Sequence, residues 1–171
     1  MAAEILAAAA RVLASTGGQA SMHDVAAAAG IARGTLYRYF PTRSALVERL
    51  RIVATEEAAA KLEASRVDQL DPLEGLERTI RAFVDVGDMF VVSARERGRV
   101  GGAEFDASIV KPLRALIERG QKARVVRDDM DAAWLTESLV GLILAGAASR
   151  MGTEDTIASI RRLFLEGARA G

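Results

Sequence analysis

The fold is decided by one stretch of sequence, Arg33-Gly34-Thr35-Leu36-Tyr37-Arg38-Tyr39-Phe40. Gly30 stands just before it and is the residue type that most readily takes the left-handed conformation that ends a helix. Pro41 follows it, lacks an N–H and disfavours helical geometry in the residue before it. The pattern therefore predicts a short helix from about Ala32 to Tyr39.

Two more helices are predicted ahead of this one. Apolar residues at helical spacing indicate a helix over 3–15, which a glycine pair then ends. The segment Ser21-Met22-His23-Asp24 has the serine and the acid of a helix start, and predicts a second helix from Ser21 to about Ala29. Short helices joined by so tight a turn must cross steeply and share one small core. The spacing assigns to that core Val25, Ala26, Ala29, Ile31, Leu36 and Phe40.

The other side of the third helix is then a polar, basic and aromatic surface. Such a surface is what the recognition helix of a helix-turn-helix presents to DNA. An arginine pairs bidentately with guanine, a threonine offers a hydroxyl or a methyl group, and a tyrosine reaches phosphate oxygens. Residues 31–51 hold five arginines against one acid, Glu48, although the whole chain is neutral with 23 basic and 23 acidic residues. The attraction to nucleic acid is therefore expected to be local.

At these residues the chain resembles the TetR family of bacterial transcriptional regulators. The resemblance rests on the run from Gly30 through Gly34-Thr35-Leu36-Tyr37-Arg38-Tyr39-Phe40 to Arg43, and extends roughly from Ile5 to Leu50. It implies a homodimer with two headpieces that binds a palindromic double-stranded DNA operator. It also implies an all-helical body that binds a small-molecule effector, and DNA release when that effector shifts the headpieces.

The resemblance also implies individual roles in DNA binding. Ser21, Tyr39 and Arg43 correspond to phosphate contacts. Arg33, Thr35, Tyr37 and Arg38 correspond to contacts at or near base edges, and Gly34 to a position of close approach. Two features depart from the family pattern: the chain begins almost at the first helix, without a basic arm, and Arg43 stands where a lysine is usual.

The composition favours an all-α, soluble, cytoplasmic protein. Helix-forming residues dominate, and no alternation of period two is long enough for a strand. The chain has no cysteine, which excludes thiolate chemistry. With His23 as its one histidine as well, an enzymatic function is disfavoured. No cofactor or metal is expected. Asp128, Asp129 and Asp131 are interpreted as capping and dipole partners of the next helix rather than ion ligands.

The predicted organisation is a DNA-binding domain over 1–45 and a helical effector-binding and dimerisation domain over 46–171, with about nine helices in all. Beyond the headpiece, helices are expected from Thr42 to about Ala64, from Leu73 to about Val91 with an alternative break near Gly87-Asp88, from after Asp106 to Gly120, over 131–150 and over 153–168. A hydrophobic effector is expected to contact residues of the middle helices, for which plain core packing remains the alternative. These candidates are Phe83, Met89, Phe90, Phe105, Ile109 and Leu113.

Residues 131–150 are apolar almost all round, with Glu137 the only charge inside. This helix needs cover on more than one side, and Glu137 leaves too short an apolar stretch to span a membrane. We therefore expect the last two helices to form a two-fold dimer seam. Its predicted residues are Leu135, Leu139, Leu142, Gly146, Ile157, Ile160 and Phe164.

Several polar groups leave alternatives open. Asp85 and Asp88 would suit a cationic effector if they are buried, and Arg95, Arg97 and Arg99 an anionic one, against an ordinary solvated surface. A second function also stays open for the whole chain. It is a ligand-binding or scaffolding dimer that has kept the headpiece and lost its affinity for DNA.

Overall fold

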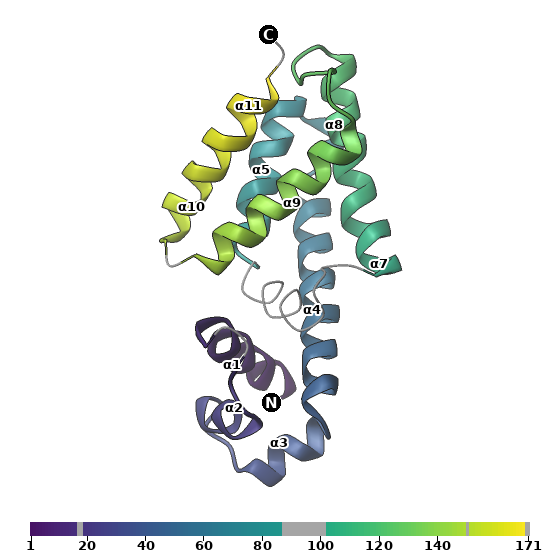
Figure 1. Ribbon diagram of the computed structural model, residues 1–171. Coiled ribbons are helices and arrows are strands. Elements are labelled where there is room, and N and C mark those ends of the chain that lie inside the picture. The colour runs from purple at the N-terminus through teal and green to yellow at the C-terminus, as the bar shows by residue number, and fades with distance from the viewer. Residues whose placement is uncertain (17–18, 87–101, 150, 170–171) are drawn as a thin grey trace. The chain divides into compact units, whose positions relative to one another are not determined.

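A computed structural model describes residues 1–16, 19–86, 102–149 and 151–169 (Figure 1). Within these ranges every regular element is helical, which confirms the all-α prediction, and Val126 and Arg169 form only an isolated β-bridge. Eight helices are present in the described part, against about nine expected. The chain divides into two compact units, one of Met1–Ala54 and one of the described residues from Thr55 onward. A functional division at residue 45 stays a prediction.

The first unit contains α1 (Ala2–Ser15), α2 (Met22–Ala28), α3 (Arg33–Tyr39) and the beginning of α4 (Arg43–Ala64). The helix ends follow the local sequence signals. Gly30 lies between α2 and α3 with φ +65°, the left-handed conformation that glycine takes without strain. Thr42 begins α4 by accepting a hydrogen bond from the N–H of Ala45 at 3.1 Å.

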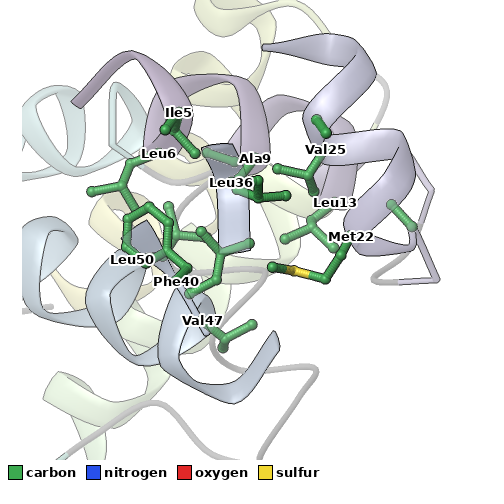
Figure 2. Close-up of a cluster of buried hydrophobic side chains, with 14 residues drawn as sticks. Ile5, Leu6, Ala9, Leu13, Met22, Val25, Leu36, Phe40, Val47 and Leu50 are labelled. Atoms are coloured by element: carbon green, nitrogen blue, oxygen red, sulfur yellow. The ribbon is translucent and has the colours of Figure 1, made fainter. Parts of the chain in front are cut away.

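The core of the first unit joins all four helices (Figure 2). Leu36 of α3 is fully buried in it, and Phe40 is 6% exposed. Val47 and Leu50 of α4 belong to the same cluster, which the sequence had not predicted. Ala29 and Ile31, predicted as core, are only partly buried and pack against it. The remaining buried members are Ile5, Leu6, Ala9, Ala10, Leu13, Ala20, Met22, Val25, Ala26 and Leu46.

The second unit is built from four helices in addition to the end of α4 (Figure 1). The first is α5 (Pro72–Val84) and the third is α9 (Ala132–Ala148). The second is continuous through α7 (Ala103–Phe105), a π-helical segment (Asp106–Val110) and α8 (Lys111–Lys122). The last is continuous through α10 (Thr153–Ile160), a π-helical segment (Arg161–Leu165) and α11 (Glu166–Ala168). α5 packs against α8, α9 and α10, and α9 packs against α8 and α10.

Two helix boundaries differ from the sequence prediction. α5 ends at Val84, whereas helical spacing had been extended to about Val91, and residues 87–101 lie outside the described part. The α7–α8 helix begins at Ala103, before the expected start after Asp106. Gly102 provides its non-helical first residue, with φ 145°. The continuous helix then includes a π-helical turn, which periodicity alone does not reveal.

Arg119 of α8 is hydrogen-bonded to the connection between α4 and α5. Its guanidinium donates to three backbone carbonyls, those of Val67 at 2.6 Å, Asp68 at 2.6 Å and Leu70 at 2.8 Å. We call this arrangement the Arg119 clamp. The connection contains Arg66 in a left-handed conformation, φ 46°, followed by a 3-10 turn over Val67–Gln69. The clamp therefore satisfies carbonyls that neither neighbouring helix uses.

Candidate nucleic-acid interface

The side chains of α3 divide into two faces. Leu36 is fully buried, whereas Arg33, Gly34 and Arg38 are exposed. Tyr37 and Tyr39 are 41% and 42% exposed, so both phenols are accessible to solvent. Thr35 is half-buried at the edge. The structure thus brings the predicted residues of α3 together on one solvent-facing surface.

Gly34 is not required by the packing of the protein itself. A Cβ atom added there would meet no atom within 4 Å, and its φ is not in the left-handed region. A glycine at such a position is favourable when an external molecule must approach the backbone closely. The space in front of Gly34 fits the predicted close approach.

The electrostatics of this surface are positive because no carboxylate is near in sequence. Residues 25–47 contain neither Asp nor Glu, and Glu48 pairs with Arg51 at 2.9 Å. Within the described part of the chain, Arg33 and Arg38 form no ion pair. The guanidinium carbon of Arg38 instead lies 5.7 Å from the centroid of the Tyr39 ring. Two cationic side chains therefore stand unneutralised on α3.

Ser21 and Asp24 begin α2 with a capping box. The Ser21 hydroxyl oxygen accepts from the N–H of Asp24 at 3.2 Å, and the Ser21 N–H donates to Asp24 Oδ2 at 2.8 Å. The hydroxyl also donates to Asp24 Oδ2 at 2.7 Å. Ser21, predicted as a phosphate contact, is therefore already engaged, and a phosphate must compete with Asp24 for its hydroxyl proton.

These hydrogen bonds also affect the acidity of Asp24. Donation from the Ser21 hydroxyl, and then from the Ser21 N–H, lowers the pKa of Asp24 below its ordinary value. Because the folded-state pKa is lowered, the stabilisation is present above the ordinary carboxyl pKa and is lost as the pH falls through the lowered one. Asp24 is therefore ionised at neutral pH.

Arg43 has an internal contact that its sequence context did not indicate. Its Nε donates to the backbone carbonyl of Ala20 at 3.5 Å, and the side chain is half-buried. This contact joins the start of α4 to the residue before the capping box of α2. Arg43 therefore has a structural contact in addition to its predicted role at a phosphate.

Four of the six predicted effector residues are described, and all four are buried in the second unit. Phe83 of α5 is 4% exposed and Ile109 and Leu113 of the α7–α8 helix are 1% and 0% exposed, while Phe105 is 6% exposed. Met89, Phe90, Asp88 and the three arginines 95, 97 and 99 lie outside the described residues. Asp85 forms an ion pair with Lys61 at 3.0 Å, the side chains being 45% and 40% exposed, so it is already paired with a positive charge.

A polar surface groove of about 760 Å³ lies elsewhere in the second unit. None of the predicted effector residues lines it. Its walls are Arg124, Val126, Arg127, Asp128, Asp129, Glu166, Gly167 and Arg169. Arg127 and Asp129 pair at 2.6 Å across its rim, which lowers the pKa of Asp129. The groove is therefore unlike the hydrophobic site that the sequence predicted.

The predicted dimer-seam residues mostly face the interior of their own chain. Five of them are at most 5% exposed, namely Leu135, Leu139, Ile157, Ile160 and Phe164. Leu142 is half-buried. At Gly146 an added Cβ would lie 2.6 Å from Thr156 Cγ2, so this glycine allows α10 of the same chain to approach α9. These inward residues stabilise the protomer itself.

A different set of residues on the last two helices faces outward. Trp134 is 59% and Leu163 is 65% exposed, and Ala145 and Ala148 are exposed on the same side of α9 as Trp134. A Cβ at Gly141 would meet nothing within 4 Å. We call Trp134, Gly141, Ala145 and Ala148 of α9, together with the exposed Leu163 of the last helix, the outward face; the charged Glu137 is exposed on the same side of α9 as Trp134. The sequence had indicated that the small residues Gly141, Ala145 and Ala148 would let a partner helix approach, but the predicted seam list contains none of the outward face, because an all-round apolar helix does not show which side its own chain covers.

Of the three acidic residues before α9, Asp131 acts as the sequence predicted, whereas Asp129 pairs with Arg127 instead. Asp131 accepts from the N–H of Ala133 at 2.6 Å and so caps the helix. Over the described ranges, no cluster of His, Asp and Glu side chains has the arrangement of a metal site. Among the same residues, no helix has the length and apolarity needed to cross a membrane.

The family profile and the two sequence relatives that match this chain all describe regulatory proteins. The family profile described as "Bacterial regulatory proteins, tetR family" matches residues 5–50. The HTH-type transcriptional regulator NfxB of Pseudomonas aeruginosa is 27% identical over 162 residues, covering 88% of this chain and 85% of NfxB. The HTH-type transcriptional repressor LfrR of Mycolicibacterium smegmatis is 29% identical over 132 residues, covering 74% of this chain and 67% of LfrR.

The same relative is similar in three dimensions. The crystal structure of the TetR-like regulator LfrR from Mycobacterium smegmatis in complex with proflavine superposes with a TM-score of 0.74 and 25% identity. The match covers 98% of this chain and 96% of that chain. The similarity therefore extends over both compact units rather than the headpiece alone.

Proposed function

Since the chain belongs to the TetR family of bacterial transcriptional regulators, we propose that it is a ligand-released repressor that binds a palindromic operator as a homodimer. The observation that carries the proposal is the solvent-facing surface of α3, on which two unneutralised arginines and two tyrosines surround Gly34. Such a surface combines donors for base edges with donors for phosphate oxygens. We assign base reading to Arg33, Thr35, Tyr37 and Arg38, and phosphate contacts to Tyr39, Arg43 and Ser21.

In this proposal two copies of α3 enter successive major grooves of one operator. The half-sites are then separated by about one helical turn, roughly 34–36 Å, or by a multiple of it. The operator is expected to be roughly palindromic because the two copies are related by a two-fold axis. α4 carries residues of both compact units in one continuous helix, and supports a mechanism in which a change in the body alters the headpiece.

The effector is expected to be a small molecule with a large apolar surface. Buried aromatic and aliphatic residues of α5 and of the α7–α8 helix, Phe83, Phe105, Ile109 and Leu113, support this class. The solved structure of LfrR contains proflavine, a flat aromatic molecule, in a chain of the same fold. Binding would favour a headpiece arrangement that no longer matches the operator.

Replacement of Arg33 by Ala tests the assignment of base reading. We expect a loss of about 1–3 kcal/mol in operator binding and relaxed specificity at one base position. Arg43→Ala should weaken specific and random DNA alike and reduce the salt dependence. Fluorescence anisotropy with an operator obtained by selection from random duplexes, at several stated salt concentrations, measures both effects.

Equal losses for Arg33→Ala on operator and random DNA would contradict base reading by Arg33. An unaltered preference at every base position would contradict it as well. If the native chain shows no sequence preference in the selection, the alternative of a ligand-binding or scaffolding dimer without DNA affinity takes the place of the repressor.

The outward face predicts the oligomeric state and its weak point. The chain should behave as a dimer of about 36 kDa, twice its 18.2 kDa, in size-exclusion chromatography with light scattering at micromolar concentration. Gly141→Arg places a charged side chain in the middle of this face and should produce monomers, because the charge must lose water in the dimer. The matched control is Ala115→Arg on the exposed side of α8, which should remain dimeric. A monomeric native chain, or a dimeric Gly141→Arg variant, would contradict this seam.

A further inference from the structure

We propose that Tyr39 is a positioning residue for Arg38: its ring holds the Arg38 guanidinium ready to read a base, apart from any contact of its phenol with phosphate. The proposal rests on the proposed function, because it concerns how α3 recognises its operator. It adds a specificity role to a residue that otherwise only grips the DNA backbone.

The geometry of the pair is the first argument. The guanidinium carbon of Arg38 lies 5.7 Å from the centroid of the Tyr39 ring, within the roughly 6 Å at which a cation is attracted to an aromatic face. Both side chains are exposed, so neither packing nor burial forces them together. Successive residues of a helix point about 100° apart, because a turn takes about 3.6 residues. The Arg38 side chain must therefore turn toward the ring.

Arg38 has no carboxylate partner among the described residues that would compete with the ring. Residues 25–47 contain no carboxylate, and Arg38 forms no ion pair with any described residue. On α4, Arg51 shows the other situation, since it is bound to Glu48 at 2.9 Å. An arginine paired in this way must give up its carboxylate before it can bind DNA, whereas Arg38 is held by a neutral ring.

The ring contact also leaves hydrogen-bond donors of the Arg38 guanidinium for DNA. When an arginine stacks on an aromatic ring through the plane of its guanidinium, the N–H groups on its edge stay available for hydrogen bonds. Arginine has many rotamers, and fixing it beforehand reduces the conformational entropy that is lost on binding. The ring thereby increases the affinity of Arg38 for its base without contacting that base.

Two substitutions separate the ring from the phenol. Tyr39→Phe removes the hydroxyl and keeps the ring, whereas Tyr39→Leu removes both. Anisotropy titrations with the selected operator and with a scrambled duplex of the same length, at one salt concentration, give the affinities. We expect Tyr39→Phe to weaken both duplexes equally. Tyr39→Leu should weaken the operator by a further two- to fivefold, about the value of an exposed cation–π contact, and leave the scrambled duplex at the Tyr39→Phe level.

A double-mutant cycle identifies the partner. In an Arg38→Ala background, the additional loss of Tyr39→Leu over Tyr39→Phe should disappear. In an Arg33→Ala background the additional loss should persist, because among the described arginines it is Arg38 that lies over the ring. If Tyr39→Leu equals Tyr39→Phe on the operator, or if its extra loss persists without Arg38, the positioning role is overturned.

A measurement on the free protein distinguishes this failure from failure of the proposed function. The δ protons of Arg38 should show an aromatic ring-current shift in NMR spectra of the native chain and of Tyr39→Phe, and lose it in Tyr39→Leu. A native chain that shows this shift but selects no operator refutes the repressor function together with the role in DNA reading. A chain that selects an operator but shows an additive cycle refutes only the positioning role. Unchanged thermal unfolding of each variant verifies that the fold is retained.

Discussion

Leu36→Ala should release the headpiece from its folded state and abolish operator binding, although Leu36 itself cannot contact DNA. Its side chain is fully buried where α1, α2, α3 and α4 meet (Figure 2). Truncation of a buried leucine to alanine costs about 2–5 kcal/mol, since it combines lost burial with a cavity. A unit as small as Met1–Ala54 buries a small fraction of its surface on folding, so this loss is a large part of its free energy of unfolding. Hydrogen exchange should show lost protection over residues 1–54.

The matched control for this change is Leu36→Met, which conserves volume and should cost less than about 1.5 kcal/mol. Tyr37→Ala, on the exposed side of the same helix, should weaken DNA binding with native protection of the headpiece amides. Protection of residues 1–54 at the native level in Leu36→Ala would contradict the described core.

Arg119→Ala should destabilise the second unit by about 2–3 kcal/mol, a large effect for an arginine that has no carboxylate partner among the described residues. The reason is the Arg119 clamp, in which one guanidinium satisfies three backbone carbonyls at 2.6–2.8 Å. Hydrogen bonds from a charged donor are stronger than neutral ones. Urea denaturation measures the loss, and hydrogen exchange should locate it at residues 65–71.

Two further variants serve as controls for Arg119→Ala. Arg119→Lys keeps the charge but lacks the planar fork, and should recover only part of the stability. Arg78→Ala removes an exposed arginine that pairs with Glu74 along α5 at 2.8 Å, and should change stability by less than about 0.5 kcal/mol. If Arg119→Ala were as mild as Arg78→Ala, the clamp would not hold the α4–α5 connection.

The features that sequence reasoning predicted well are those with a local cause. Ser21 and Asp24, Gly30, Thr42 and Asp131 each act within a few residues, and each begins or ends a helix where its chemistry indicated. The two faces of α3 likewise follow from helical periodicity over one short segment. Local hydrogen bonding and periodicity are therefore sufficient for the headpiece surface.

The features that were missed depend on residues far apart in the chain. The Arg119 clamp joins positions about fifty residues apart, and an arginine near the end of a helix gives no sign of which carbonyls it will find. The Arg43 contact with Ala20 has the same character. The π-helical turns change the register of two helices without changing their apolar composition.

The dimer seam shows a third kind of limit. Apolarity indicated that α9 and the last helix need cover, but it does not distinguish cover by the same chain from cover by a second copy. Leu135, Leu139 and Ile160 proved to be buried in their own protomer, while Trp134 and Leu163 remain exposed. α9 was identified correctly as unusually apolar, and only the three-dimensional arrangement sorted the faces of α9 and of the last helix.

This sorting has an evolutionary consequence if the outward face is the dimer seam. The side chains that keep each protomer folded and the side chains that choose its partner are then different sets on the same two helices. After duplication of the gene, substitutions at Trp134, Gly141 or Leu163 can prevent mixed pairs between the two products with little effect on either fold. A bacterium can thus keep many regulators of one architecture side by side, each assembling only with its own kind.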